Sequence, residues 1–422
     1  MLNYRFIAAA VVCSVLLSSN VFSGSADDYA AYKFQYFSDN NDVQVATNTL
    51  TISKKVGSRT SIAGSYLVDA ITAASKVDIK GGSPSVDAIT SASRIDERRH
   101  QVSGTVSFTD DIIKRCKPGN ESDNPTGISF TGMYGTEPDY KTKTGSFSIR
   151  QDLFSRNTTV DFSYGRSFDR FMPATRYIPP PSDAGWSYFG EGKRRTDRVS
   201  GSLTQIMTPA TLISFGGEYV FDRGYLSRPY YVYEIAAFDS LINDTTRMLY
   251  HENLPAERES MALSAQVNHY LPVKRGASLI GEYRYYRDSW EIESHTVAFT
   301  MYYRFADNFI INPHYRFYIQ RSAFFYKNTY TEVPEYLTTD FKLGGFITNT
   351  VGLNLIFELQ DFIKPVDNAF FALFPVSFDI AANYMIRSST KNIAVRNSHY
   401  SYFPIASGYR NFWIQSGIKC AF

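Results

Sequence analysis

Hydrophobic and polar residues alternate along much of this chain with a period of two. In an extended strand, successive side chains point to opposite faces, so each alternating segment predicts a strand with one apolar and one polar face. The clearest segments are residues 146–153, 160–165, 261–268, 296–304, 311–320 and 376–387. Their lengths approach the roughly 9–11 residues that a tilted strand needs to cross a bilayer. The pattern therefore favours a transmembrane sheet.

The end of the chain, residues 412–422 (FWIQSGIKCAF), shows the alternation most clearly. One face carries Phe412, Ile414, Ile418, Cys420 and Phe422, with Ser416 as its one polar residue, and the other carries Gln415, Gly417 and Lys419. This closing strand, with its terminal aromatic residue, resembles the assembly signal of bacterial outer-membrane barrels. We expect Cys420 to face lipid as an apolar residue of the strand, and not to form a disulfide with Cys116.

The connections between the segments alternate between short and long, which is typical of membrane barrels with short periplasmic turns and long outer loops. The long connections are residues 70–97, 170–193, 223–257 and 321–338. Residues 109–125 break the rule if they form a periplasmic turn. With both termini in the periplasm the strand number is even, and one strand over residues 338–359, bent at Gly344 and Gly345, brings it to sixteen.

The sequence thus predicts an all-β fold, a transmembrane antiparallel up-and-down β-barrel of about 16 strands in a single domain, with 14 or 18 strands as the alternatives. A barrel of this size leaves a water-filled or loop-plugged lumen. A soluble β-sandwich or propeller would also alternate. No repeat of about 40 residues, as propeller blades require, is visible in the chain.

The start of the chain resembles a secretory signal. Arg5 precedes a short apolar run and then small residues, so residues 1–26 are predicted to be a signal peptide, cleaved after Ser23 or Ala26. Residues 27–422 would form the barrel in the outer membrane of a Gram-negative bacterium. Outer-membrane lipid, periplasmic chaperones and the barrel-insertion machinery are the expected partners. The aromatic content of 16% fits interfacial girdles, and the net charge of +2 gives no electrostatic reason to expect nucleic acid.

Polar and charged residues gather on the predicted inner face of three neighbouring strands: Glu282, Arg284, Arg304, His314 and Arg316. Opposite charges on neighbouring strands can pair inside a barrel, so these residues form either a structural ladder or a selectivity lining for anionic or mixed solutes. The chain contains no Gly-x-Ser-x-Gly, His-Glu-x-x-His or Cys-x-x-Cys motif. We therefore expect neither an enzyme nor a metal site.

Two long loops are rich in aromatic residues and proline, around residues 177–188 and 228–233. Such loops either pack into the barrel mouth as a partial plug or offer a surface to a ligand or partner. The first alternative predicts a loop-gated pore or transport barrel, and the second predicts a structural or adhesive surface barrel. The transported solute does not follow from the sequence.

A short internal repeat adds a third hypothesis. Residues 68–75 read VDAITAAS and residues 86–93 read VDAITSAS. The repeat is a duplicated loop segment, two strand ends of similar composition, or a functional motif. Each copy resembles the acceptor motif of FAD-dependent FMN transferases, Asp-x-x-Ser/Thr-Gly-Ala-Ser/Thr, with Ala73 or Ser91 where the motif has glycine. The matching positions are Asp69, Thr72 and Ser75 in the first copy and Asp87, Thr90 and Ser93 in the second. The resemblance implies covalent FMN on Ser75 and Ser93, an FMN transferase as partner, and a role in extracytoplasmic electron transfer.

The chain as a whole also resembles a known family. The segment from Tyr32 (YKFQYFSDNNDVQV), the two VDAIT segments, the DERRH run at residues 96–100 and the closing strands are similar to the domain of unknown function 3570 family. That family is predicted to form outer-membrane barrels. The resemblance supports the barrel and implies no established activity.

Overall fold

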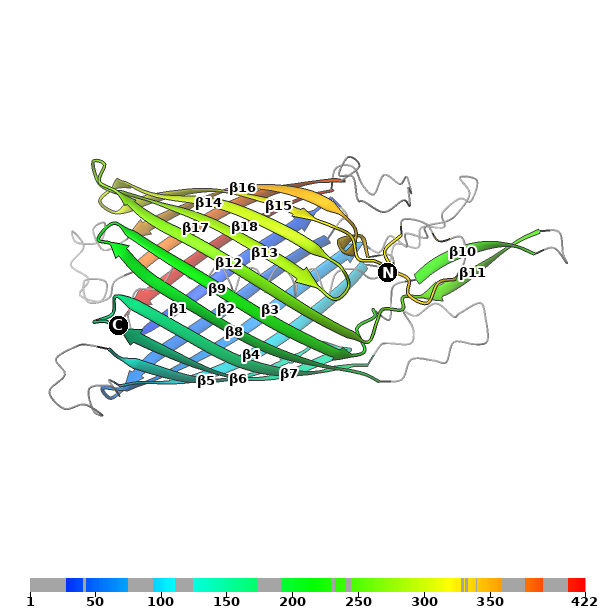
Figure 1. Cartoon of the computed structure of the whole chain (residues 1–422), viewed down its shortest axis with the longest axis horizontal. Helices are drawn as coiled ribbons and strands as arrows, with labels where there is room; N and C mark the ends of the chain where they lie inside the picture. The colour runs from blue at the N-terminus through cyan, green and yellow to red at the C-terminus, as the bar shows by residue number, and fades with distance from the viewer. Residues whose placement is uncertain are drawn as a thin grey trace.

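The computed structural model is a closed barrel of sixteen antiparallel strands with one additional hairpin (Figure 1). It describes residues 28–40, 43–74, 94–110, 124–172, 191–228, 232–239, 244–327, 330, 333–338, 340–358, 376–389 and 409–421. The barrel strands are β1 (Tyr29–Asp39), β2 (Val43–Val56), β3 (Thr60–Ala74), β4 (Arg94–Asp110), β5 (Thr126–Thr136), β6 (Tyr140–Leu153), β7 (Thr158–Phe171), β8 (Gly192–Thr208), β9 (Thr211–Gly224), β12 (Glu257–Leu271), β13 (Ala277–Asp288), β14 (Glu293–Ala306), β15 (Phe309–Gln320), β16 (Phe346–Glu358), β17 (Val376–Ser389) and β18 (Tyr409–Ala421). The strands β10 (Val232–Asp239) and β11 (Asp244–His251) form the hairpin, which projects beyond one end of the barrel (Figure 1).

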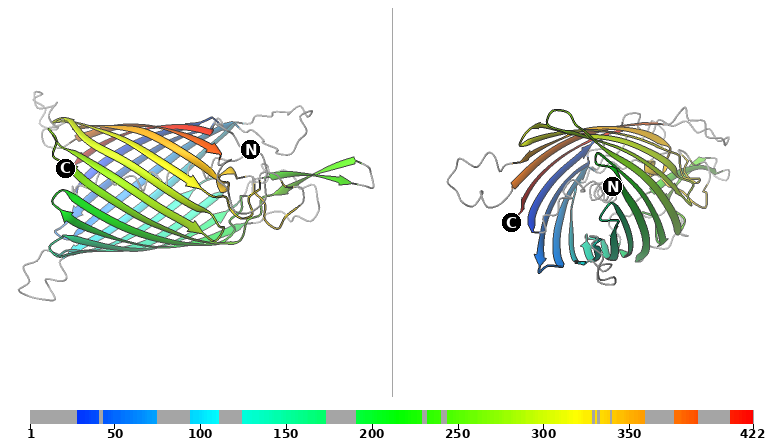
Figure 2. Two further views of the ribbon diagram at one scale, coloured as in Figure 1. Left: turned by 45° about the horizontal axis from the view of Figure 1, so that its top comes forward. Right: turned by 60° about the vertical axis from the view of Figure 1, so that its left-hand side comes forward.

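Each barrel strand pairs with the next one along the chain, except that β9 pairs with β12 past the hairpin. The closing strand β18 lies between β17 and β1, where Ile418 is opposite both Phe378 and Tyr32. The sheet is therefore closed, and the strands tilt around it (Figure 2). The predicted up-and-down barrel of sixteen strands is confirmed.

One of the predicted strands, over residues 338–359, was wrong in its extent. Residues 338–359 do not form a single bent strand, because β16 begins only at Phe346 and follows a short 3₁₀ helix, η3 (Phe341–Leu343). The side chain of Asp340 caps this helix by accepting a hydrogen bond from the Lys342 N–H at 3.0 Å. Gly344 packs against the ring of Tyr326 so closely that a Cβ would lie 2.8 Å from it. The glycine therefore allows close loop packing and does not bend a strand.

The two ends of the barrel differ in their connections. Tyr29 lies opposite Ala421, so the first and last strands meet at one end, which we call the terminal end. Its short turns are residues 57–59, 154–157, 209–210, 272–276 and 307–308. Residues 111–125, the exception expected from the sequence, and residues 359–375 are longer connections at this end.

The opposite end, which we call the loop end, carries the connections that were expected to be long. β3 continues to Ala74 and β4 begins at Arg94, so strand residues occupy both edges of the expected loop 70–97. Residues 172–191, 225–256 and 321–345 connect the other strand pairs where long loops were expected. The β10–β11 hairpin lies within the second of these connections.

The outer face of the barrel is apolar, as the alternation requires. On β9, β12 and β14, the side chains of Phe215, Leu263 and Phe299 point outward and are exposed. In the closing strand, Phe412, Ile414 and Ile418 share this outer face, and Cys420, a free thiol, has the same parity. Cys116 and Phe422 lie outside the described residues. In the part of the chain that the structure describes, no helix is both long and apolar enough to span a membrane.

Candidate functional site: a capped lumen

The inner face of the barrel has two walls of different chemistry. Along β4–β8 the wall consists mainly of small hydroxyl residues that pair across strands. Thr105 Oγ1 lies 2.9 Å from Thr131 Oγ1, and Ser163 Oγ lies 2.7 Å from Ser200 Oγ. These side chains are only partly buried. On the wall from β15 to β1, the buried inward-facing polar residues include Asn312, Thr350, Asp379, Asn383 and Gln35. Small side chains thus leave room for water along one wall, whereas larger ones fill the other.

His314 belongs to the packed wall. Its Nε2 lies 2.5 Å from Asn383 Oδ1, although β16 separates the strands that carry the two residues. Gly352 of β16 lies opposite both of them, and a Cβ there would overlap their side chains. The glycine thus permits a polar contact across the intervening strand, which gives His314 a structural partner inside the barrel.

Arg304 lies apart from the other predicted lumen residues. It sits at the terminal end of β14, where the pairing with β15 is irregular. Its Nη1 lies 3.0 Å from Glu358 Oε2, and the same nitrogen donates a hydrogen bond to the Asp307 carbonyl oxygen at 2.5 Å. Arg304 therefore links the β14–β15 turn to the end of β16 at the terminal end and does not share a space with His314.

The structure brings Glu282, Arg284 and Arg316 together on the inner face. Glu282 and Arg316 lie in one row of the sheet register, on β13 and β15, with Ala298 of β14 between them. Arg284 lies one inward-facing position closer to the loop end. All three side chains are exposed although they point into the barrel. Water therefore has access to the lumen at this level.

Ion pairs strengthen the loop end of the barrel wall. Arg194 Nε lies 3.1 Å from Asp169 Oδ2, and Arg258 Nη2 lies 2.5 Å from Asp288 Oδ2. Asp69, the acidic residue of the first FMN-acceptor-like segment, is fully buried and pairs with Arg99 of β4. Because a buried carboxylate needs such a partner, this pair has a clear structural role.

The remaining residues of the acceptor-like segments are less informative. Thr72 lies in β3, opposite Gln44 and Asp96 in the register. Ser75, Asp87, Thr90 and Ser93 lie outside the described residues. In the described residues, no group of His, Cys, Asp and Glu has the arrangement of a metal site.

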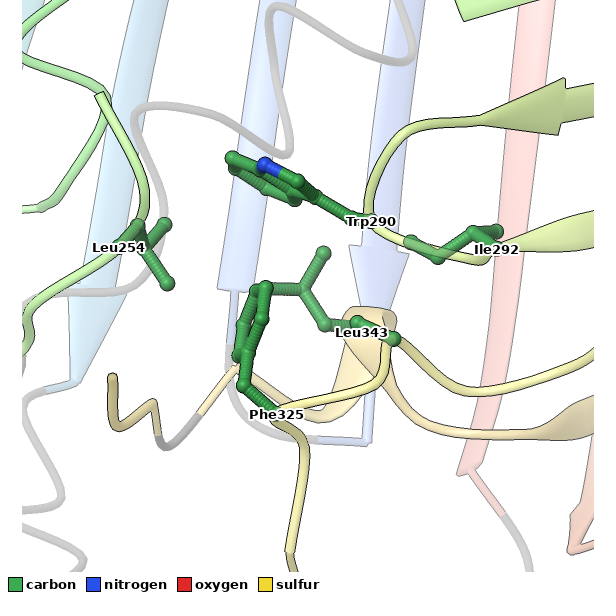
Figure 3. Packing of buried hydrophobic residues seen from close by; sticks show 6 residues of the cluster. Leu254, Trp290, Ile292, Phe325 and Leu343 are labelled. Carbon is green, nitrogen blue, oxygen red and sulfur yellow. The ribbon is translucent and has the colours of Figure 1, made fainter. Parts of the chain in front are cut away.

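Three connections at the loop end fold together into an apolar cluster (Figure 3). Leu254 precedes β12, Trp290 and Ile292 form the β13–β14 turn, and Phe325 and Leu343 come from the β15–β16 connection. All five are buried, and the rings of Trp290 and Phe325 meet edge to face at 5.3 Å. The indole N–H of Trp290 donates to the Glu257 carbonyl oxygen at 3.0 Å. We call this cluster, with the connections that carry it, the cap.

The β15–β16 connection reaches far around the barrel mouth. On one side Asp340 forms an ion pair with Arg228, which follows β9, with Oδ2 and Nη1 2.6 Å apart. On the other side the ring of Phe341 lies 4.6 Å from the Arg387 guanidinium of β17 and 5.5 Å from the ring of Tyr409 of β18. Because β12–β17 lie between β9 and β18 in the ring of strands, residues 340–341 contact side chains that come from widely separated parts of the barrel rim.

A buried polar knot joins the same connections. Glu252, which precedes β12, accepts hydrogen bonds from the Arg228 backbone N–H at 2.7 Å and from the Thr338 hydroxyl. Glu252, Thr338 and Asp340 are each at most 2% exposed. Burial raises the pKa of Glu252 to about 7, assisted by the nearby Asp340 carboxylate and opposed by Arg228. Burial also lowers the pKa of Lys342 to about 8. The cap therefore contains two groups that can change charge near neutral pH.

Sequence patterns did not identify these cap residues. Of the two loops expected to plug the mouth, residues 177–188 lie outside the described residues. In the second, residues 228–233, Arg228 contacts the cap, whereas Val232 and Tyr233 belong to β10 of the projecting hairpin. The cap is built instead from residues 252–256, 289–292 and 321–345. One signal was available: Trp290 is one of only three tryptophans, and it lies in a short connection between two clear strands.

A family model described as a protein of unknown function (DUF3570) matches residues 7–364. The chain belongs to this family. The residues that the family model matches form part of the β-barrel described above, which is of the outer-membrane type. No curated protein matches the chain.

Several solved outer-membrane proteins are similar at low identity. The siderophore receptor PirA from Acinetobacter baumannii is 12% identical, with a TM-score of 0.40 and coverage of 85% of this chain and 53% of the receptor. A bacterial polysaccharide outer membrane secretin is 6% identical, with a TM-score of 0.47 and coverage of 94% and 99%. A loop L8 deletion mutant of OmpT from Vibrio cholerae is 8% identical, with a TM-score of 0.38 and coverage of 93% and 98%. The chain spans about half the length of the siderophore receptors it matches first.

Proposed function

We propose that the chain forms a pore in the outer membrane of a Gram-negative bacterium and that its cap regulates the passage of small hydrophilic solutes. The observation that carries this proposal is the exposure of Glu282, Arg284 and Arg316 inside the barrel, directly below a folded cap. A lumen that served only as a scaffold would gain stability from filling this space. The charged residues at this level give the passage a polar lining.

The cap offers a direct test in planar lipid bilayers. Replacement of Trp290 by Ala removes the largest side chain of the apolar cluster and should destabilise the cap by about 3–5 kcal/mol. Purified wild-type protein should conduct with a low open probability, and Trp290→Ala should conduct with a higher one. Resistance to unfolding in cold SDS shows that the barrel of the variant remains folded.

The matched control is Phe154→Ala. This residue is also aromatic, but it is 75% exposed in a turn of the terminal end. Its replacement should leave the conductance unchanged. If neither the wild type nor Trp290→Ala conducts while both are folded, the pore is refuted and a surface-binding barrel becomes the better explanation.

The flavin hypothesis stays a prediction, and the described part of the motif limits when modification occurs. In the folded barrel, the Asp69 carboxylate has no exposed surface and pairs with Arg99, so a transferase has no access to it. We propose that any FMN transfer to Ser75 precedes barrel assembly. Intact-mass measurement on protein made in its native host should then show the mass of one FMN per modified serine, while folded unmodified protein incubated with transferase and FAD should gain none on Ser75. An unmodified native protein refutes the hypothesis.

A further inference from the structure

Two inward-facing arginines lack the carboxylate partner that three other arginines of the inner wall have. Arg198 lies 3.5 Å from Glu218, Arg194 lies 3.1 Å from Asp169, and Arg258 lies 2.5 Å from Asp288. Within the described residues, neither Arg284 nor Arg316 has a carboxylate within ion-pair distance, so their guanidinium groups are open to a ligand.

The register brings these two arginines into one space. Arg284 lies opposite Thr296 of β14, and Arg316 lies opposite Ala298, two residues further along the same strand. Because the side chains of β14 between them are small, both long side chains extend into the lumen without a barrier. The two guanidinium groups are close enough to repel each other.

Among the described residues, one acidic side chain acts against this repulsion. Glu282 lies in the same row as Arg316 and attracts it, but it does not balance two positive charges. These three side chains together therefore carry a net positive charge.

Both arginines are also held in position from above. The Arg284 guanidinium carbon lies 5.6 Å from the centre of the Tyr286 ring, and that of Arg316 lies 5.2 Å from the centre of the Tyr318 ring. The Tyr286 hydroxyl donates to Asp288 at 2.9 Å, and the Tyr318 hydroxyl donates to Gln320 at 2.5 Å. These bonds fix the tyrosines and so limit the freedom of the arginines below them.

We propose that Arg284 and Arg316 form a binding site for the oxyanion group of a small solute, a phosphate or a carboxylate. The planar fork of a guanidinium group matches two oxygens of such an anion, and two forks held on alternate strands can grip it from two directions. Ser264 is exposed and lies opposite Arg284 in the register, and its hydroxyl makes only a long hydrogen bond, 3.5 Å, to the Gly216 carbonyl oxygen. This site deepens the proposed pore function by naming the class of solute.

Equilibrium binding tests the site without relying on conduction. Detergent-purified full-length protein is titrated by calorimetry with inorganic phosphate and, separately, with citrate, at constant ionic strength with chloride as the background anion. We expect Arg284→Gln combined with Arg316→Gln to weaken binding by about tenfold or more, since each variant removes a charged donor pair. The two probes show whether phosphate or carboxylate is preferred.

The matched control is Arg198→Gln, because Arg198 is also exposed inside the barrel but is paired with Glu218. It should change the Kd by less than about twofold. If Arg198→Gln weakens binding of the probes as much as the double variant does, the effect is one of general charge and the site is overturned. A wild-type protein that binds neither probe also overturns the site. Binding by a barrel that never conducts supports the site but refutes the pore, and conduction without binding refutes the site alone.

Discussion

Glu252 is the residue whose ionisation matters most to the cap. It is 2% exposed, and it receives hydrogen bonds from two connections that are distant in sequence. Burial raises its pKa to about 7, so the folded cap binds a proton that the opened cap releases at its ordinary pKa near 4.5. The stability of the cap therefore falls as the pH rises from about 4.5 to about 7, by at most about 3 kcal/mol.

Lys342 affects the stability of the cap at higher pH and in the opposite direction. Its pKa is lowered from 10.5 to about 8 by burial, so the folded cap favours the neutral amine. Cap stability therefore rises again as the pH increases from about 8 to about 10.5. Together, the two residues predict that the cap is least stable between about pH 7 and 8.

These signs give a prediction for conductance as a function of pH. The open probability of the wild-type pore should be low at pH 5 and rise toward pH 7.5, because deprotonation of Glu252 weakens the closed cap. Glu252→Gln keeps a neutral acceptor in the knot, so its open probability should stay low and change little over this range. Single-channel recording at a series of pH values measures both.

Glu335→Gln is the control for this prediction. Glu335 lies in the same β15–β16 connection but is exposed, so its removal should preserve the response of the wild type to pH. A Glu252→Gln protein whose open probability still rises with pH as in the wild type would show that another group governs the cap.

At the scale of single elements, the strands were predictable and the cap was not. The alternation over residues 296–304 and 376–387 depends only on neighbouring residues along the chain, because a barrel strand has one lipid face and one lumen face. Arg284 and Arg316 were predicted to face inward by the same rule, and the structure places them so.

The cap depends on contacts between residues far apart in sequence. Leu254, Trp290 and Leu343 lie in three different connections, and no local period relates them. The same reason explains the misread strand at residues 338–359: Gly344 fits the ring of Tyr326, a contact that sequence spacing does not reveal. Even within a correctly predicted strand, the partner of a side chain does not follow from the sequence. The contact of His314 with Asn383 depends on the register of β16 and on Gly352.

At the scale of the whole molecule, the even number of strands determines the arrangement of the two ends. Because Tyr29 pairs with Ala421, the seam between β1 and β18 ends at the terminal end, where five of the short turns lie. The closing strand, whose pattern first indicated a membrane barrel, thus joins the first strand along its whole length. If the short turns face the periplasm, as they do in membrane barrels, then the cap and the β10–β11 hairpin face the outside of the cell (Figure 2).

Two valines provide a matched test of this orientation. Val333, in the β15–β16 connection at the loop end, is 49% exposed, and Val273, in the β12–β13 turn at the terminal end, is 47% exposed. We expect a membrane-impermeant maleimide to label Val333→Cys on intact cells, because the reagent reaches only the outer surface. Val273→Cys should react only after the outer membrane is permeabilised. The parent protein, with Cys420 half-buried in the barrel wall, gives the background labelling.

The outcomes of this experiment separate orientation from location. Labelling of Val273→Cys on intact cells, with Val333→Cys protected, would mean that the barrel is inserted in the opposite direction. Protection of both cysteines until permeabilisation would mean that the protein does not reach the cell surface. In either of these cases the cap could not control entry from outside, and any effect of pH on it would have to arise in the periplasm.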